Sequence, residues 1–238
     1  MSLFEFSLAA AAVFVGAAIW GSLGFGFAFV VIPVISVLDP SLLPPVVWLL
    51  GMPFAFAMLR RERQHLEVKT ARTLLIGKLV GTPLGVWLLA AVPADNLGIM
   101  FAVALLAAVA ISAIDRRTVP HRTGVLFSIG GVSGVMGTAA ALGGPPLALG
   151  LRSMMPSGFR ATLAMCFVLG DLMSLLGIVV AGIFRLEHLA MAAAFAPPMM
   201  IGFLLSGRVI NFTRPNVLRV AVLIFAALSS IRALVIAF

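Results

Sequence analysis

Hydrophobic residues fill long stretches of this chain, and polar residues gather in the short segments between them. The long stretches predict helices, because they lack the alternation of apolar and polar positions that marks a half-buried strand. Their ends are predicted to within about 2–4 residues. The predicted helices lie at 6–22, 27–38, 41–59, 73–91, 97–114, 124–141, 143–151, 161–184, 189–206 and 217–237.

Most of these stretches are long enough to cross a membrane, since a spanning helix needs about 20 predominantly apolar residues. The composition agrees, with 62% hydrophobic and 10% charged residues among 238. A membrane β-barrel is excluded because it would show alternating strands of about 10 residues. The first stretch contains Glu5 and no Lys or Arg, so we expect a retained membrane helix and not a signal peptide. The pattern therefore predicts an all-α, polytopic helical membrane protein.

Two of the predicted helices, 27–38 and 143–151, are too short to cross a membrane alone. Each follows a glycine-rich break, "GSLGFGF" in the first case and "GTAAALGG" in the second. In lipid, a helix break is tolerated only where the freed N–H and C=O groups are buried in protein or line a cavity. We therefore expect each broken segment to form a hairpin that enters the membrane and returns to the same side.

Basic residues occupy the short loops, so the net charge of +8 reflects membrane orientation and predicts no nucleic-acid partner. Loop 60–72 holds five Lys and Arg, loop 115–123 holds three and loop 92–96 holds none, which places the first two loops in the cytoplasm. With hairpins at the breaks, thirteen basic residues lie inside and two outside; with single crossings the numbers are ten and five. The hairpin interpretation follows the positive-inside rule better and places both termini outside.

The chain contains an internal repeat. At a constant offset of 113, the pairs are Gly21 with Gly134, Gly24 with Gly137, and Pro33 with Pro146. Each half consists of one broken hairpin and three helices, and this odd number of crossings makes the second half start from the opposite side. The sequence therefore predicts two inverted-topology repeats, 1–114 and 115–238, within one membrane domain. Many secondary transporters have this architecture.

The two breaks predict where an anion binds. Gly24 and Gly26 permit unusual backbone angles, and two prolines after the second break suit a first helical turn. A helix start presents free N–H groups and the positive end of a dipole, so two such starts facing each other make an anion site. Alternatively, the glycines only permit close helix packing. The predicted substrate-binding residues are Gly24, Gly26, Pro33, Lys78, Thr138, Gly143, Gly144, Pro145 and Pro146.

Asp171 and Lys78 fall inside predicted helices, where charged groups are expensive and are functional candidates. Asp171 lies near the middle of 161–184 and either carries a proton during transport or has a structural role. Lys78 either attracts the substrate anion, pairs with Asp171 or extends its stem to the interface. Further hydroxyls either donate to oxyanions or bond back to their own backbone. They belong to Ser22, Thr82, Ser133, Thr138 and Ser174.

Other chemistry is not indicated. His65, His121 and His188 lie near helix ends without metal-ligand spacing, and we expect them to be solvated. The single Cys166 cannot form a disulfide framework. Because the sequence has no nucleophile elbow, phosphate loop or HExxH motif, we expect neither an enzyme, a cofactor nor a metal site. The expected partners are the lipid bilayer and a small anion; assembly into a homo-oligomer stays open.

The stretches "GSLGFGFAFVVIPVISVLDP" and "ALGGPPLALGLRSMMPSGFRATL" together resemble the TauE/SafE family of sulfite and organosulfonate exporters. The resemblance includes "FRAT" at 159–162 and the glycines of "GKLVGTPLG". It implies a secondary transporter of exporter type for small anions such as sulfite or organosulfonates. It also implies alternating access around the two breaks, in a plasma membrane and specifically a prokaryotic inner membrane. A passive anion channel and a non-transporting membrane subunit stay open as alternatives.

Overall fold

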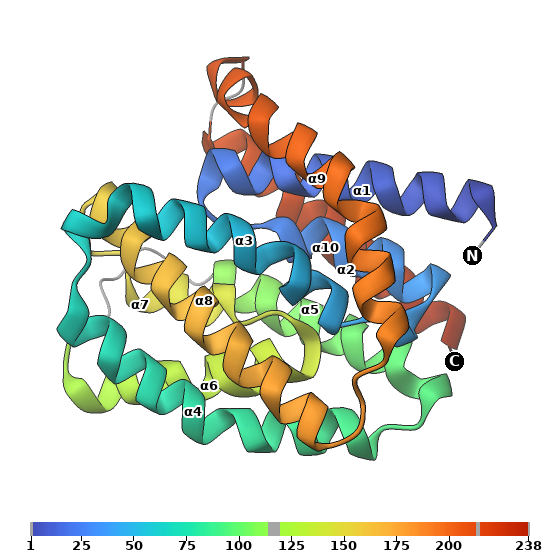
Figure 1. Cartoon of the computed structure of the whole chain (residues 1–238), viewed down its shortest axis with the longest axis horizontal. Coiled ribbons are helices and arrows are strands. Elements are labelled where there is room, and N and C mark those ends of the chain that lie inside the picture. Colours follow the sequence, from blue (N-terminus) through green and yellow to red (C-terminus); the bar gives the residue numbers. More distant parts are fainter. Residues whose placement is uncertain (1, 114–119, 213–214, 238) are drawn as a thin grey trace. The chain divides into compact units, whose positions relative to one another are not determined.

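The computed structural model describes residues 2–113, 120–212 and 215–237, and helices dominate these residues (Figure 1). The α-helices are α1 (Leu3–Leu23), α2 (Phe27–Leu38), α3 (Pro45–Glu62), α4 (Val68–Ala91), α5 (Leu97–Ala113), α6 (Thr123–Ala140), α7 (Gly144–Gly150), α8 (Pro156–Val180), α9 (Leu186–Phe212) and α10 (Pro215–Ala237). Short 3₁₀ turns are η1 (Pro40–Leu42), η2 (Arg63–His65) and η3 (Ala94–Asn96). Each predicted apolar stretch corresponds to one α-helix. The predicted repeat boundary at 114/115, much of loop 115–123 and part of loop 207–219 lie outside the described residues.

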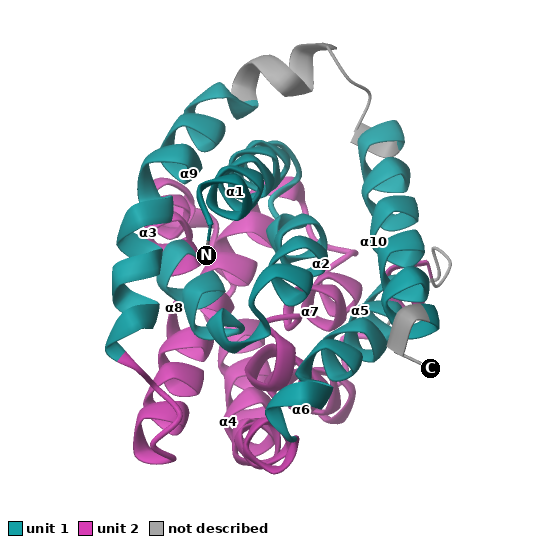
Figure 2. Ribbon diagram, turned by 90° about the vertical axis from the view of Figure 1, so that its right-hand side faces the viewer, with its two compact units in different colours: residues 1–50, 93–109, 186–238 teal, residues 51–92, 110–185 magenta. Residues whose placement is uncertain are grey.

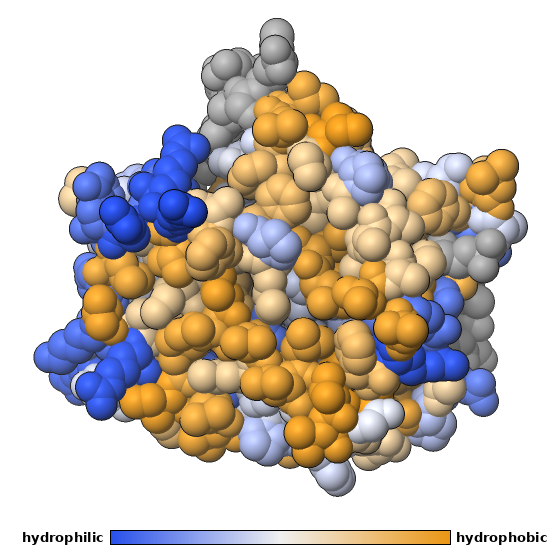
Figure 3. Space-filling view, in the orientation of Figure 1, coloured by the Kyte–Doolittle hydropathy of each residue, from blue (hydrophilic) through white to orange (hydrophobic). Residues whose placement is uncertain are grey.

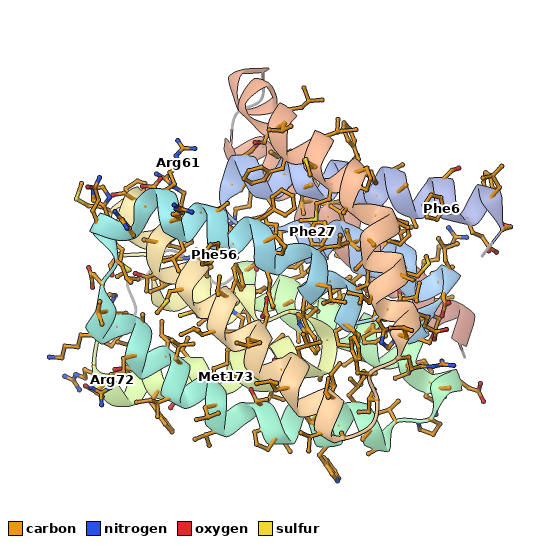
Figure 4. All side chains as sticks on the ribbon, in the orientation of Figure 1. Phe6, Phe27, Phe56, Arg61, Arg72 and Met173 are labelled. Carbon is orange, nitrogen blue, oxygen red and sulfur yellow. The ribbon has the colours of Figure 1, made fainter. Side chains whose placement is uncertain are left out.

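Seven of the described helical segments are long and apolar enough to cross a membrane, which confirms the polytopic helical class. They are Leu3–Leu23, Val68–Ala91, Ala94–Ala113, Thr123–Ala140, Pro156–Val180, Leu186–Ser206 and Val217–Val235. Helix α3, which the sequence predicts as a span, is not among them, since its 18 residues end in Arg60, Arg61 and Glu62. Hydrophilic side chains gather over the end of α3 and the start of α4 (Figure 3), where Arg61 and Arg72 are labelled in Figure 4.

The helices form two compact units (Figure 2). Unit 1 comprises Met1–Leu50, Pro93–Val109 and Leu186–Phe238, and unit 2 comprises Gly51–Val92 and Ala110–Arg185. In unit 1, α1 packs along α9 and α2, and α10 packs on α2. In unit 2, α4 packs along α6 and α8, and α7 contacts both α6 and α8. Each unit thus combines helices from both halves of the sequence.

Glycines bring α4 and α6 into backbone contact. Gly77 and Gly81 of α4 face backbone carbonyls of α6, and Gly134 of α6 faces the carbonyl of Lys78. A Cβ atom at any of these glycines would collide with the opposite backbone. This is small-xxx-small packing, made here by glycines outside the two helix breaks. It holds the Lys78 backbone directly against α6.

Unit 1 contains a comparable contact between α1 and α9. Gly202 of α9 faces the carbonyl of Phe14, and Gly21 of α1 faces the side chain of Ser206. The Ser22 hydroxyl lies 2.8 Å from the Ala18 carbonyl of its own helix and 3.0 Å from the Ser206 carbonyl. Ser22 therefore bonds to backbone, as one of its two predicted alternatives states.

The first break follows the prediction in detail. Gly24 and Gly26 both have a positive φ, 81° and 111°, the conformation that glycine adopts without steric cost. The indole N–H of Trp20 donates to the Gly24 carbonyl at 3.0 Å, so a side chain of α1 satisfies that carbonyl at the break. The Phe27 ring then lies 5.8 Å from the Trp20 ring, as α2 returns along α1.

The second break differs from the first in its backbone conformation. Its left-handed residue is Ala141, with a φ of 56°, whereas Gly143 has a φ of −70° and Gly144 begins α7. Gly143 is needed for space, since a Cβ there would lie 3.0 Å from the Ser133 hydroxyl. The helix is broken at residues 141–143, and the left-handed residue of the break is Ala141 and not Gly143 or Gly144. The two prolines that follow lie in the first turn of α7, as predicted.

Candidate functional site

A buried ion pair joins α4 and α8 within unit 2. Lys78 Nζ lies 3.2 Å from Asp171 Oδ1 and donates to the Cys166 carbonyl at 3.4 Å. The Lys78 side chain is 1% exposed and the Asp171 side chain is 14% exposed. The sequence left several roles open for Lys78, and the structure shows the pairing with Asp171. The lysine stem does not extend to a helix end, so the interfacial alternative is not observed.

Glycines make the space through which the Lys78 side chain reaches Asp171. A Cβ at Gly170 would collide with the Nζ, Cε and Cδ atoms of Lys78. A Cβ at Gly137 would lie 3.6 Å from Lys78 Cε. The lysine therefore occupies a slot that exists because Gly170 of α8 lacks a side chain, whereas a Cβ at Gly137 of α6 would make only an ordinary van der Waals contact with it.

Hydroxyl groups near the ion pair are engaged with protein atoms. Thr82 donates to the Lys78 carbonyl at 2.9 Å, and Ser174 donates to the Gly170 carbonyl at 3.0 Å. Thr138 Oγ1 lies 2.7 Å from Ser174 Oγ. Among the described residues, every buried side-chain nitrogen and oxygen has a hydrogen-bond partner. The alternative that the hydroxyl bonds to the backbone of its own helix is therefore confirmed for Thr82 and Ser174. An anion can bind these hydroxyls only if an existing hydrogen bond breaks.

Ser133 ties the second break to α6. Its hydroxyl donates to the Gly143 carbonyl at 2.9 Å, and its side chain is fully buried. Ser133 follows Trp20 by 113 positions, the offset that relates the two glycine motifs. In each half, the residue at this position therefore satisfies a carbonyl at the helix break, although one residue is an indole and the other an alcohol.

The predicted site residues are divided between the two units. Gly24, Gly26 and Pro33 belong to unit 1. The unit 2 residues are Lys78, Thr138, Gly143, Gly144, Pro145, Pro146 and Asp171. Pro33 lies in the interior of α2 and not at its start. The approach of the two helix starts toward each other stays a prediction.

The "FRAT" motif at 159–162 has a positioning role that the sequence did not reveal. Arg160 donates through Nε and Nη2 to Glu62 Oε1, at 3.1 and 2.8 Å. Thr162 Oγ1 accepts from the Glu67 backbone N–H at 3.4 Å. These bonds fasten the start of α8 to the segment that leads into α4. The motif therefore helps to set the register of the two helices that carry Asp171 and Lys78.

The histidines do not all behave as predicted. His188 is 1% exposed, and its Nε2 atom lies 3.1 Å from the Ser41 carbonyl within unit 1, so the expectation that it is solvated is wrong. His65 and His121 are exposed, as expected. In the described part of the chain, no three His, Cys, Asp or Glu side chains gather as a metal site.

Comparison with known proteins gives one match. A family model described as Sulfite exporter TauE/SafE matches residues 8–233 of the 238. The match includes both helix breaks and both members of the ion pair, and it confirms the resemblance carried by the two glycine motifs. No curated protein and no solved structure matches the chain. The matched family consists of membrane transporters and not of enzymes, as the sequence predicts.

Proposed function

Because the chain belongs to the TauE/SafE sulfite exporter family, we propose that it is a secondary transporter of small anions such as sulfite or organosulfonates. We place it in the plasma membrane of a prokaryote. The observation that carries the proposal is the buried Lys78–Asp171 pair within a multi-span membrane protein. Ionisable groups at this depth are expensive, and in membrane proteins they mark ion and proton pathways.

The ion pair supplies a mechanism for coupling. Lys78 offers the positive charge that attracts an anion, and the Asp171 carboxylate competes for the same ammonium group. A proton on Asp171 removes that competition, because a neutral carboxyl binds an ammonium less strongly than a carboxylate does. Loss of the proton restores the ion pair and releases the anion. Proton binding at Asp171 would therefore accompany anion binding at Lys78.

The two helix breaks complete the proposed pathway. We propose that Gly24, Gly26 and Pro33 in one half, and Thr138 with 143–146 in the other, line the route of the anion. Irregular backbone is tolerated in a membrane where it borders a cavity, and transporters bind substrates at such broken helices. Alternating access around these breaks would expose the route to one side at a time.

Two surface grooves support the proposal that 1–114 and 115–238 are inverted repeats. Helices α1, α2 and α10 border a groove of about 390 Å³ in unit 1, and α6, α7 and Ile111 border one of about 430 Å³ in unit 2. The paired lining residues are Ala11 and Gly124, Ala12 and Val125, Val15 and Ser128, and Ile19 and Val132. Every pair differs by 113, the offset of the glycine motifs. The α1–α9 and α4–α6 contacts correspond under the same repeat.

The proposal is tested by substrate flux into proteoliposomes. The substrates are sulfite, sulfoacetate, taurine and a plain carboxylate, each with and without a pH gradient. We expect saturable flux of one anion that a pH gradient accelerates, and Asp171→Asn should abolish the acceleration. Asp95→Asn, which changes an exposed carboxylate in η3, is the matched control. Unsaturable flux would indicate a passive channel, and the absence of flux for every substrate would contradict transport.

A further inference from the structure

The ion pair is electrically neutral, and its surroundings contain no further charge. In unit 2, α4 from residue 73 onward, α6, α7 and α8 from residue 161 onward carry two charged side chains, Lys78 and Asp171. The only other titratable group on these packed segments is the Cys166 thiol, which is fully buried. Any change of charge at the site must therefore be balanced by what enters or leaves.

Asp171 is the more exposed partner of the ion pair. The Asp171 side chain is 14% exposed, whereas the Lys78 side chain is 1% exposed. Because Cys166, the other partner of Lys78 Nζ, is fully buried, we expect an anion to approach from the side of Asp171 and to displace its carboxylate. The displaced carboxylate stays among apolar helices without a second cation, where an unpaired charge is strongly disfavoured. Protonation at an Asp171 oxygen removes that charge.

From this charge balance, and resting on the function proposed above, we infer that the site carries a singly charged anion together with one proton. In the empty site, Lys78 is paired with the Asp171 carboxylate. In the loaded site, the anion oxygen accepts the Nζ–H bond and Asp171 holds a proton taken from the side where the anion entered. Anion and proton leave together on the other side. The site has zero net charge in both states, so each transport step is electroneutral.

The inference specifies the substrate class. A sulfonate or the hydrogen sulfite ion has one negative charge and leaves the loaded site neutral. A dianion such as sulfate would leave one uncompensated negative charge among apolar helices, so we expect it to be carried about 100-fold more slowly or worse. Direction then depends on the combined anion and proton gradients, and export occurs where the outward anion ratio exceeds the inward proton ratio.

The test measures charge movement by the wild-type protein in proteoliposomes. Methanesulfonate and hydrogen sulfite are the monoanion probes, sulfate is the dianion probe, and an internal dye reports pH. Potassium diffusion potentials set the membrane voltage. We expect methanesulfonate uptake to acidify the lumen by one proton per anion, and we expect the accumulation ratio of both monoanions to be independent of voltage. For a carrier that moves one net charge, that ratio would change about 50-fold per 100 mV.

The outcomes separate this inference from the proposed function. Voltage-dependent accumulation of the monoanions, or sulfate flux comparable to theirs, would overturn electroneutral monoanion transport while leaving anion transport in place. The absence of flux for all three probes would contradict the proposed function as well. Voltage-independent, proton-linked flux confined to the monoanions supports the inference.

Asp171→Asn gives an independent readout. The amide cannot take up a proton, so anion binding at Lys78 would add one net negative charge to the site. We expect the residual methanesulfonate flux to become voltage-dependent and to stop acidifying the lumen, whereas Asp95→Asn keeps the wild-type behaviour. Flux by Asp171→Asn that stays proton-linked and voltage-independent would overturn the inference. Where this variant does not fold, the wild-type voltage measurement decides alone.

Discussion

Lys78 and Asp171 stand 93 positions apart in the sequence, and their side chains meet at 3.2 Å between α4 and α8. The contact depends on glycines of the neighbouring helices, because Gly134 admits the α4 backbone and Gly170 admits the lysine stem. The pair is thus built into the packing of unit 2. Its stability and its function can be separated by changing one partner or both.

We expect Lys78→Met alone to destabilise the protein by about 3–5 kcal/mol, because it leaves a buried carboxylate without its cation. Adding Asp171→Leu should recover most of this loss, since a well-packed apolar pair can replace a buried ion pair at little cost. Thermal unfolding in detergent of the two single variants and the double variant gives the coupling energy. A double variant destabilised by the sum of the two single effects would show that the two residues do not interact.

Gly170→Ala should disable transport without removing any charge. The added Cβ collides with the Lys78 side chain and moves its ammonium group away from Asp171. We expect saturable anion flux to fall about tenfold or more, the equivalent of about 1.4 kcal/mol of lost interaction. Gly124→Ala is the matched control, since a Cβ there meets no atom within 4 Å. Equal flux in both variants would show that Lys78 need not occupy its slot.

Ser133→Ala should loosen the second helix break. The Gly143 carbonyl would lose its hydrogen-bond donor in a buried site, which costs about 1–3 kcal/mol. Ser128→Ala changes an exposed serine of the same helix, whose hydroxyl bonds to the Gly124 carbonyl, and should stay within about 0.5 kcal/mol of wild type. Thermal unfolding of both variants measures the difference, and equal midpoints would refute the assigned role of Ser133.

Ala141→Gly should stabilise the protein, contrary to the usual effect of glycine near a helix. The backbone of Ala141 is in the left-handed helical region, a conformation that costs an L-residue about 1–2 kcal/mol and glycine almost nothing. After the greater chain entropy of glycine is subtracted, we expect a gain of about 0.5–1 kcal/mol. Ala139→Gly, inside α6, should instead lose about 1 kcal/mol. A lower unfolding midpoint for Ala141→Gly would contradict the assigned backbone conformation.

The proposed orientation can be read from thiol labelling, because the single native Cys166 is fully buried and gives a low background. In intact cells, a non-permeant maleimide should label Leu3→Cys and Asp95→Cys, which we place outside. Arg61→Cys should react only after the membrane is opened. Labelling of Arg61→Cys in intact cells, with protection of Asp95→Cys, would reverse the topology.

The sequence predicts the helices well because hydropathy alone marks them. Helix α2 was expected at 27–38 and spans these same residues, since a glycine break precedes it and Asp39 and Pro40 follow it. Helix α3 shows the limit of this prediction. The helix continues past its apolar residues into Arg60, Arg61 and Glu62, and these three charged residues keep it from qualifying as a membrane span. Length and composition therefore predict a helix more reliably than they predict what the helix crosses.

The site is less visible in the sequence because it depends on distant contacts. For Lys78 the sequence leaves three roles open, and in the structure the packing of α4 on α8 brings it into an ion pair with Asp171. The left-handed turn falls on Ala141, which carries no turn signal, while Gly143 provides only space. His188 is buried, and its Nε2 atom lies near the carbonyl of Ser41, 147 positions away in the sequence. No local sequence pattern indicates this contact.

The most direct test of the central claim is anion flux through the double variant Lys78→Met/Asp171→Leu. This variant is expected to fold, so a loss of transport cannot be attributed to misfolding. We predict that it inserts and unfolds closer to wild type than Lys78→Met does, yet shows no saturable, pH-accelerated flux of hydrogen sulfite or methanesulfonate. Flux at the wild-type rate, with the same response to a pH gradient, would show that the ion pair is not the transport site.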